Sequence, residues 1–191
     1  YGNHAEATGS PFAATGIVNG AQTFSSTSYV NIPFDDSYEW AANASFSFEV
    51  WVKTGNSANT KTLVFLGRKR IDEWFTNWSV GIDASERPYF YMSDAFGMDT
   101  IISGTTSIAD NIWHHIVAVR NGTTDRNQLY VDGVMVKDAL INYGNSFGTN
   151  AADSIPIYMG WFNSGDLHQF TGEMDEVAIF NKALTGTEIT D

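Results

Sequence analysis

The sequence contains no cysteine among its 191 residues. This excludes disulfides, cysteine-ligated zinc sites and thiol nucleophiles, although it does not fix the compartment. No run reaches 18 apolar residues, so we expect no membrane insertion. Basic residues are also scarce, because 10 Lys and Arg stand against 22 Asp and Glu, a formal net charge of −12. This charge would repel nucleic acid and anionic membranes and would suit Ca²⁺.

The composition that remains is that of one folded domain. Hydrophobic residues make up 43% of the chain and aromatic residues 14%, which disfavours disorder. No linker or fixed-period repeat divides the sequence, so we expect a single domain over residues 1–191. The chain starts at Tyr1 without Met and ends soon after a helix start at Thr185. From this we expect a module excised from a larger protein, with other domains of the same polypeptide as partners.

Short apolar segments separated by Gly, Ser, Thr, Asn and Asp recur about every ten residues. This spacing predicts an all-β fold, a two-sheet antiparallel β-sandwich. Near the end of the chain, Thr185 and Glu188 form a capping-box pattern, which predicts a short C-terminal helical turn. The expected strands span residues 21–24, 29–32, 45–53, 62–66, 78–82, 88–92, 101–104, 113–120, 128–131, 134–137, 155–159 and 174–180.

The clearest strand alternates from Phe46 to Lys53. Its even-numbered residues are Phe and Val and predict a core face, whereas its odd-numbered residues are Ser47, Glu49, Trp51 and Lys53. A polar face with one large aromatic is normal for a shallow sugar-binding surface. It is equally compatible with Trp51 being covered by a neighbouring loop, and the sequence leaves both interpretations open.

A second landmark is the strand at residues 113–120, followed by a hairpin at residues 129–136. Asp132 and Gly133 separate the two apolar runs of this hairpin and predict a type I′ turn, in which both central residues have positive φ. We interpret His114 and His115, which lie within the first strand, as structural residues.

Six segments in a defined order give the chain a family resemblance: Gly2-Asn3-His4, Phe24 with Tyr29-Val30, and residues 46–53, 113–119, 129–133 and 172–185. In this order they resemble the laminin-G-like jelly-roll domains of the concanavalin A-like lectin and glucanase superfamily, most closely the bacterial branch. The resemblance covers essentially the whole chain, and the order of the segments is more specific than any one of them. It implies a jelly-roll sandwich and a secreted or cell-surface bacterial protein.

The resemblance also implies a structural Ca²⁺ that ties the N-terminal segment to the final strands. Transferred to this sequence, the ligands would be the side chain of Asp175 with carbonyl groups around Gly2, Asn3 and Ser26. The family often has Asp-Gly after Phe24, where this chain has Ser25 and Ser26, so a ligand set that relies on that Asp is altered here. Alternatively, Asp175 accepts local amide hydrogen bonds and binds no cation.

Catalysis is disfavoured by the carboxylate pattern. Glucanases of the resembling superfamily place two Glu and an Asp on one face of a strand. Glu173 and Asp175 share a face here, but the next positions are Val177 and Ala178, and Glu176 points away. No nucleophile-elbow or zinc-protease motif is present. We therefore expect a protein that is not an enzyme, and a glycan-cleaving activity is the least favoured alternative.

Two loops, residues 68–78 and 160–170, are rich in aromatic and planar polar side chains. Such side chains recognise sugars by stacking on C–H faces and by hydrogen bonding to hydroxyl groups. We expect them to bind a ligand at the concave face or rim of the sandwich, where Tyr89 and Tyr91 could share a face with Trp51. The candidate ligand-binding residues are Arg68, Arg70, Asp72, Trp74, Trp78, Trp161, Phe162, Asn163 and His168, with Trp51, Tyr89 and Tyr91.

The only basic run, Arg68 to Arg70, has two interpretations. Bidentate Arg contacts would suit a carboxylate or sulfate on an acidic polysaccharide. The simpler interpretation is that the run pairs with Asp72 and Glu73 on an exposed loop and contributes little.

The favoured hypothesis is a non-catalytic, lectin-like carbohydrate-binding module of a secreted or surface protein, with a polysaccharide or glycan as partner. The alternative is a protein–protein adhesion or spacer module. The sequence does not name the sugar, because specificity depends on loop geometry that a fold does not transmit.

Overall fold

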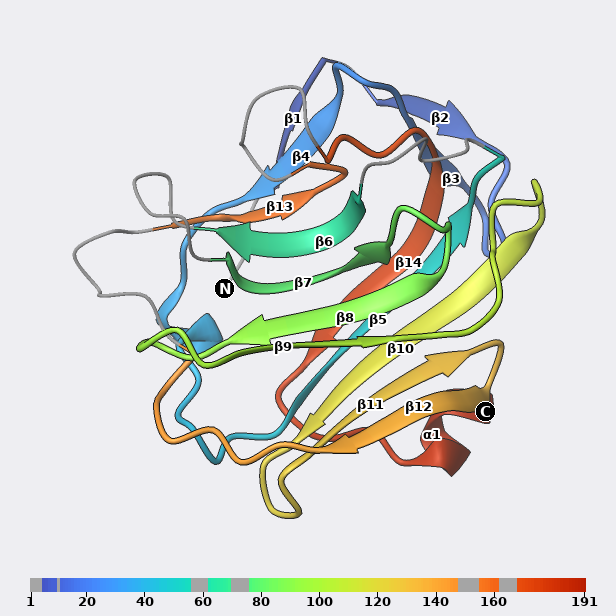
Figure 1. The fold of residues 1–191 in the computed structure, drawn as a ribbon. Coiled ribbons are helices and arrows are strands. Elements are labelled where there is room, and N and C mark those ends of the chain that lie inside the picture. Colours follow the sequence, from blue (N-terminus) through green and yellow to red (C-terminus); the bar gives the residue numbers. More distant parts are fainter. Residues whose placement is uncertain (1–4, 10, 56–61, 70–75, 148–154, 162–167) are drawn as a thin grey trace.

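A computed structural model describes residues 5–9, 11–55, 62–69, 76–147, 155–161 and 168–191. Within these residues, every strand pairs antiparallel with its neighbours in one of two seven-stranded sheets (Figure 1). Sheet A has the order β1-β4-β13-β6-β7-β8-β9, and sheet B has the order β12-β11-β10-β5-β14-β3-β2. The predicted all-β sandwich is confirmed.

The elements of sheet A are β1 (Glu6–Thr8), β4 (Tyr29–Ile32), β13 (Ile157–Met159), β6 (Leu63–Lys69), β7 (Thr76–Ile82), β8 (Pro88–Ser93) and β9 (Asp99–Ser103). Those of sheet B are β12 (Val134–Leu140), β11 (Arg126–Val131), β10 (Trp113–Asn121), β5 (Phe46–Lys53), β14 (Gly172–Phe180), β3 (Ala21–Phe24) and β2 (Phe12–Ala14). A 3₁₀ turn, η1 (Asp36–Tyr38), follows β4, and one helix, α1 (Gly186–Thr190), ends the chain.

All twelve predicted strands are present as β3 to β14, with boundaries shifted by a few residues. The sequence reading missed β1 and β2, which are three residues long and lie at the edges of the two sheets. Their residues are almost all exposed, so neither strand carries the buried-exposed alternation by which a strand is recognised.

The core lies between the two sheets and is filled by aromatic rings from both. On β5, Phe46, Phe48, Val50 and Val52 are at most 2% exposed, which confirms the predicted core face. Phe48 stacks on Trp78 of β7 with ring centroids 4.0 Å apart, so this pair joins sheet B to sheet A. Burial of each large apolar side chain contributes about 1.5–3 kcal/mol, so this packing between the sheets stabilises the sandwich.

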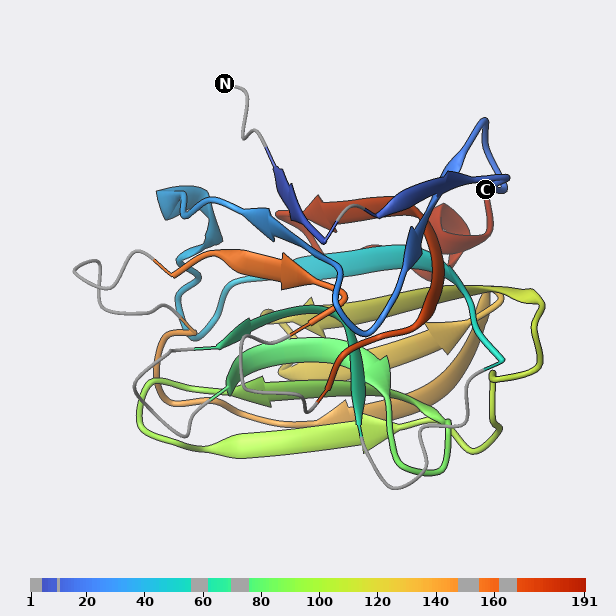
Figure 2. The same cartoon turned by 90° about the horizontal axis from the view of Figure 1, so that it is seen from above.

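Two local predictions about the C-terminal half are also confirmed. Asp132 and Gly133 have φ values of 51° and 77°, as a type I′ turn between β11 and β12 requires. Thr185 and Glu188 form the capping box at the start of α1. Figure 2 shows the same sandwich from above. No helix among the described residues is both long and apolar enough to cross a membrane.

Candidate functional site

The outer face of sheet B, which points away from the core, is divided into two halves. Over one half, the C-terminal segment packs on the sheet, and Leu184 and Ile189 cover Val117, Val119 and Tyr130. The hydroxyl of Ser47 lies under the same segment, where it donates to the Lys182 carbonyl (2.9 Å) and accepts from the Leu184 amide (3.0 Å). We call this region the covered half.

The other half of the face carries aromatic and charged side chains. Trp51 of β5 lies opposite His115 of β10, and their rings stack at 4.9 Å with an angle of 17° between their planes. His115 Nε2 lies 2.7 Å from Glu49 Oε1, so the carboxylate fixes the orientation of the imidazole. Trp51 is half-buried and His115 is buried. His115 on the neighbouring strand thus supports the indole of Trp51 by stacking against it.

Two residues further along β5, the same face carries a charged pair. Lys53 Nζ lies 3.3 Å from Glu173 Oε2 on β14, and the two side chains are 34% and 25% exposed. Trp113 of β10 lies opposite Lys53 of β5, and the Lys53 ammonium lies 6.0 Å from the centroid of the Trp113 ring. We call Glu49, Trp51, Lys53, Trp113, His115 and Glu173 together the Trp51 strip.

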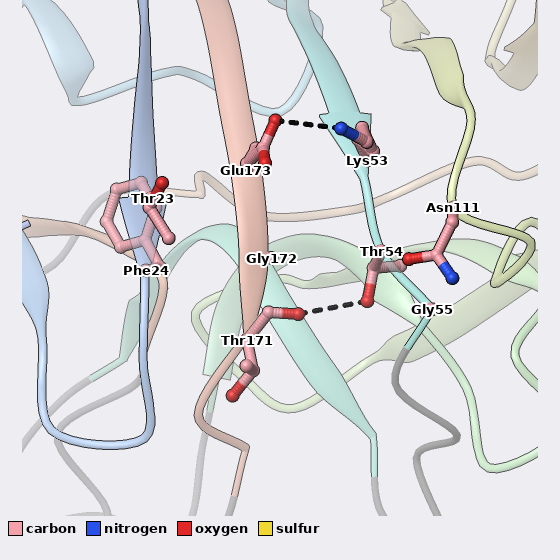
Figure 3. A pocket seen from close by; sticks show the side chains of 9 residues that line it. All are labelled: Thr23, Phe24, Lys53, Thr54, Gly55, Asn111, Thr171, Gly172 and Glu173. Carbon is pink, nitrogen blue, oxygen red and sulfur yellow. Dashed lines mark hydrogen bonds and ion pairs between the residues drawn. The ribbon is translucent and has the colours of Figure 1, made fainter. Parts of the chain in front are cut away.

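A pocket of about 370 Å³ lies at the end of the strip. Figure 3 shows the Lys53–Glu173 pair toward one end of this pocket and a hydrogen bond from Thr54 to the Thr171 carbonyl, 2.9 Å long, toward the other. Asn111 lies beside Thr54 and Gly55 on the far side from Thr23 and Phe24 (Figure 3). The strip and its pocket thus combine aromatic planes with paired donors and acceptors, which is the chemistry that binds a polyhydroxylated ligand.

A second aromatic group lies on the outer face of sheet A. Trp161 packs on Tyr29 at 4.7 Å and on Tyr158 at 6.0 Å. Tyr158 pairs with Asn31, while its neighbours Ile157 and Met159 pack on the core, so this group points outward. Its described contacts are mainly aromatic, unlike the charged contacts of the Trp51 strip.

His168, another predicted ligand-binding residue, is held against the start of β6. Its Nδ1 lies 2.9 Å from the Thr62 carbonyl, and its own carbonyl accepts from the Val64 amide at 3.1 Å. Its φ is 79°, in the left-handed region. In these contacts His168 fixes the chain to the sheet.

Three predicted ligand-binding residues are wrong, because their side chains are buried. Trp78 is fully buried against Phe48. Arg68 is fully buried as well, with its guanidinium 2.6 Å from Glu39 Oε1 and donating to the Tyr38 carbonyl at 3.1 Å. Its burial contradicts a direct contact with an acidic polysaccharide and the expected exposed position, while its predicted partners Asp72 and Glu73 lie outside the described residues.

Tyr89 is the third of these residues. It is 2% exposed, its hydroxyl lies 3.2 Å from Ser79 Oγ, and burial raises its pKa. Tyr91 remains half-buried on the same strand. Both tyrosines belong to sheet A and Trp51 to sheet B, so the expectation that they share a face with Trp51 is wrong. The core lies between them.

Several predicted residues lie outside the described part of the chain. These are the candidate ligand-binding residues Arg70, Asp72, Trp74, Phe162 and Asn163 and the candidate metal ligands Gly2 and Asn3.

Asp175 accepts backbone hydrogen bonds. Its Oδ2 accepts from the amides of Ile17 (2.8 Å) and Val18 (3.1 Å), and its Oδ1 accepts from the amide of Glu176 (2.9 Å). The carboxylate is buried, and the described residues contain no group of three His, Cys, Asp or Glu side chains arranged for a metal. These three N–H groups direct partial positive charge at the oxygens that a cation would need.

Ser26 does not fit the implied cation site. Gly172 pairs with Phe24 and Met174 with Gln22, so Asp175 lies level with the first residue of β3 and Ser26 lies beyond its last residue. At about 3.3 Å per residue, β3 alone separates them by about 10 Å. The two cannot bind one Ca²⁺, whose oxygen ligands lie within about 2.6 Å of the ion. A Ca²⁺ at Asp175 with other ligands stays a prediction.

Two carboxylates of β14, Glu173 and Asp175, are each held by other groups of the protein. Glu173 pairs with Lys53, and Asp175 binds backbone amides.

His114 lies between two carboxylates, with Nδ1 2.8 Å from Asp132 Oδ2 and Nε2 3.2 Å from Asp110 Oδ1. Asp132 also accepts from the amide of His115 at 2.9 Å, so this cluster fixes the hairpin turn to β10.

The part of the strip that comes from β10 and β14, namely Trp113, His115 and Glu173, is not predicted from the sequence. Glu49 and Lys53 were placed on the face of Trp51, but their partners were not identified. The signal for Trp113 and His115 was their spacing of two residues, which puts both on one face of β10. Nothing in the sequence shows that this face continues that of Trp51, because residues 51 and 115 meet only through the register of β5 with β10.

The comparison with solved structures shows the fold. The binding domain of Paraclostridial Mosquitocidal Protein 1 superposes with a TM-score of 0.79 at 18% identity, over 98% of this chain and 46% of that one. The Botulinum Neurotoxin serotype G binding domain gives 0.74 at 18% identity, over 99% and 46%. This chain thus spans about half the length of both binding domains.

A third similar structure matches over most of its own length. Domain 4 of AbnA, a GH43 extracellular arabinanase from Geobacillus stearothermophilus, in complex with arabinotriose, gives a TM-score of 0.71 at 19% identity, over 97% of this chain and 86% of that one. A search of curated proteins finds no match.

The family comparison covers most of the sequence and agrees with the sandwich described above. The family model described as the concanavalin A-like lectin/glucanases superfamily, of the laminin-G type, matches residues 19–190. This range includes β3 to β14 and α1, so both sheets except their edge strands β1 and β2 fall within the match, together with the C-terminal helix. The chain therefore belongs to the concanavalin A-like lectin/glucanases superfamily.

Proposed function

We propose that this domain is a non-catalytic carbohydrate-binding module that binds a glycan on the Trp51 strip. The observation that carries the proposal is the half-buried Trp51, stacked on His115, beside the Lys53–Glu173 pair. An indole plane can stack on the C–H face of a sugar, and the charged groups next to it can bond the sugar's hydroxyls. Two structures with a similar fold contain glycans, domain 4 of AbnA with arabinotriose and the binding domain of Botulinum Neurotoxin DC with SialylT, and this supports a glycan ligand.

The aromatic group around Trp161 is the second candidate surface in this proposal. Trp161 belongs to the predicted ligand-binding loop at residues 160–170, and Tyr29 and Trp161 are half-buried rather than buried. A polysaccharide chain could contact either face, so the two surfaces must be tested separately. We further propose that the domain acts in a secreted or cell-surface protein and keeps neighbouring domains near their substrate.

A glycan array with purified domain tests the proposal. We expect the wild-type domain to retain a defined set of oligosaccharides and Trp51→Ala to lose them. Phe96→Ala, which removes an aromatic ring that is 85% exposed elsewhere, is the matched control and should bind like wild type. Trp161→Ala reports on the second surface.

If the domain binds no plant, algal or host glycan on the array, the proposal is wrong, and the adhesion or spacer role is then favoured. If Trp51→Ala binds normally and Trp161→Ala does not, glycan binding stands but belongs to sheet A.

A further inference from the structure

The pocket at the end of the Trp51 strip contains one cation and one anion that neutralise each other. Lys53 and Glu173 come from adjacent strands and face each other at 3.3 Å (Figure 3). Among the described residues that line the pocket, these two are the only charged ones. A bound ligand would therefore meet a strong dipole but little net charge.

Asn111 adds a side-chain amide to the same pocket. Its φ is 65°, and its backbone amide donates to the Thr54 carbonyl at 3.0 Å. Its carboxamide lies against Gly55, where a Cβ would come within 2.3 Å of both the amide oxygen and the amide nitrogen. A side chain at residue 55 would therefore displace the carboxamide, and the hydrogen bond to Thr54 positions the backbone of Asn111 beside the pocket.

These groups match the hydrogen-bonding pattern of adjacent hydroxyl groups. An ammonium only donates, a carboxylate only accepts, and a carboxamide does both. Each hydroxyl of a vicinal diol can accept from one such group and donate to another. The pocket volume, about 370 Å³, lies within the range of small-molecule sites.

We propose that this pocket binds one uncharged sugar residue through its vicinal hydroxyls, so that the domain selects neutral over acidic glycans. The inference rests on the proposed glycan-binding function and specifies its ligand class. A carboxylate on the sugar would be drawn to Lys53 but repelled by Glu173 beside it. The net charge of −12 on the whole chain adds to this repulsion. Arg68, the centre of the predicted acidic-glycan interpretation, is buried and paired with Glu39.

The test uses an array that displays each acidic oligosaccharide beside its carboxyl-reduced, neutral counterpart. We expect the wild-type domain to retain the neutral member of each bound pair at least about tenfold better, since a like charge at close range opposes binding. Glu173→Gln leaves the Lys53 charge unopposed, so binding of the acidic members should rise by roughly threefold or more. Asn111→Gly keeps the positive φ but removes the carboxamide, and should weaken neutral binding by roughly fivefold.

The outcomes separate this inference from the proposed function. Trp51→Ala should weaken every bound glycan, charged or neutral, because stacking does not depend on charge. A wild-type domain that prefers the acidic members, or a neutral preference unchanged in both Glu173→Gln and Asn111→Gly, overturns the pocket assignment while glycan binding stands. Retention of no glycan overturns both. Thermal melting of each variant identifies a change that acts through misfolding.

Discussion

The covered half of sheet B and the Trp51 strip are built from the same strands, yet their outward side chains differ in kind. On β10, Val117 and Val119 lie under α1, whereas Trp113 and His115 lie beyond it. On β5, Ser47 bonds to the C-terminal segment, whereas Glu49, Trp51 and Lys53 do not face it.

The difference shows that the outward side chains of sheet B differ according to whether another segment of the chain packs on them. Where the chain itself covers the strands, the outward residues Val117, Val119 and Tyr130 carry no charge and form a second apolar cluster with Leu184 and Ile189. Where no described element covers them, the residues are aromatic and charged, and their described side-chain contacts join them to one another. An exposed surface that serves stability alone has no need of stacked aromatic rings. The predictions below test this division.

The largest effect is expected in the covered half. Leu184 is 7% exposed and packs on Val117, Val119 and Tyr130. Leu184→Ala should lower the free energy of unfolding by about 3 kcal/mol, as a cavity in a packed cluster does, with glycan affinity unchanged. Urea denaturation measures the loss, and Leu140→Ala, at a site 71% exposed, is the control. Equal losses in the two variants would show that the covered half is not a core.

A somewhat smaller effect, on affinity rather than stability, is expected four residues away from Val117 on the same strand. Trp113→Ala should weaken glycan binding about tenfold, or about 1.4 kcal/mol, because the strip loses one of its two indole planes. Val117→Ala should instead lower stability and leave affinity unaltered. Isothermal titration with the best glycan from the array measures both variants. Weaker binding in Val117→Ala alone would contradict the division.

Asp175 of β14 lies next to Trp51 of β5, at the border of the strip. Asp175→Asn should cost about 1.5 kcal/mol of unfolding free energy, because the amide cannot accept all three N–H groups that the carboxylate accepts. Asp36→Asn, at an exposed position, is the control. A melt with EDTA tests the predicted Ca²⁺ separately. An EDTA-sensitive midpoint that Asp175→Asn abolishes would reveal a bound cation, and an unchanged midpoint would remove it.

The smallest effect concerns pH and the helix that covers the sheet. A hydrogen bond from Lys182, together with those from Thr185, lowers the pKa of Glu188 to about 2. Because the folded pKa is depressed, this contribution to stability is present above about pH 4.5 and is lost as the pH falls toward 2. Glu188→Gln should therefore be less stable than wild type at pH 6, and the two should converge near pH 2. A stability difference that does not change with pH would contradict this assignment.

The sequence predicted the fold well because strand alternation and turn residues are local signals. The core face of β5, the Asp132-Gly133 turn and the capping box at Thr185 each depend on residues a few positions apart, and each is confirmed.

The candidate site could be predicted only in part, because it is assembled from distant segments. Trp78 and Trp51 both looked like sugar ligands, but one lies in the core and the other on an outer face. Which face a strand buries follows from alternation, while which strands lie side by side follows from the sheet order. The pairs Trp51–His115 and Lys53–Glu173 join residues 64 and 120 positions apart, and no local pattern encodes them.

The most direct test of the Trp51 strip is an NMR titration that follows the six tryptophan indole N–H signals, assigned by single Trp→Phe variants, as the best glycan is added. We predict that the signals of Trp51 and Trp113 move in a saturable manner, while those of the buried Trp40 and Trp78 stay in place. Movement of the Trp161 signal with no change at Trp51 and Trp113 would contradict the account and place binding on sheet A.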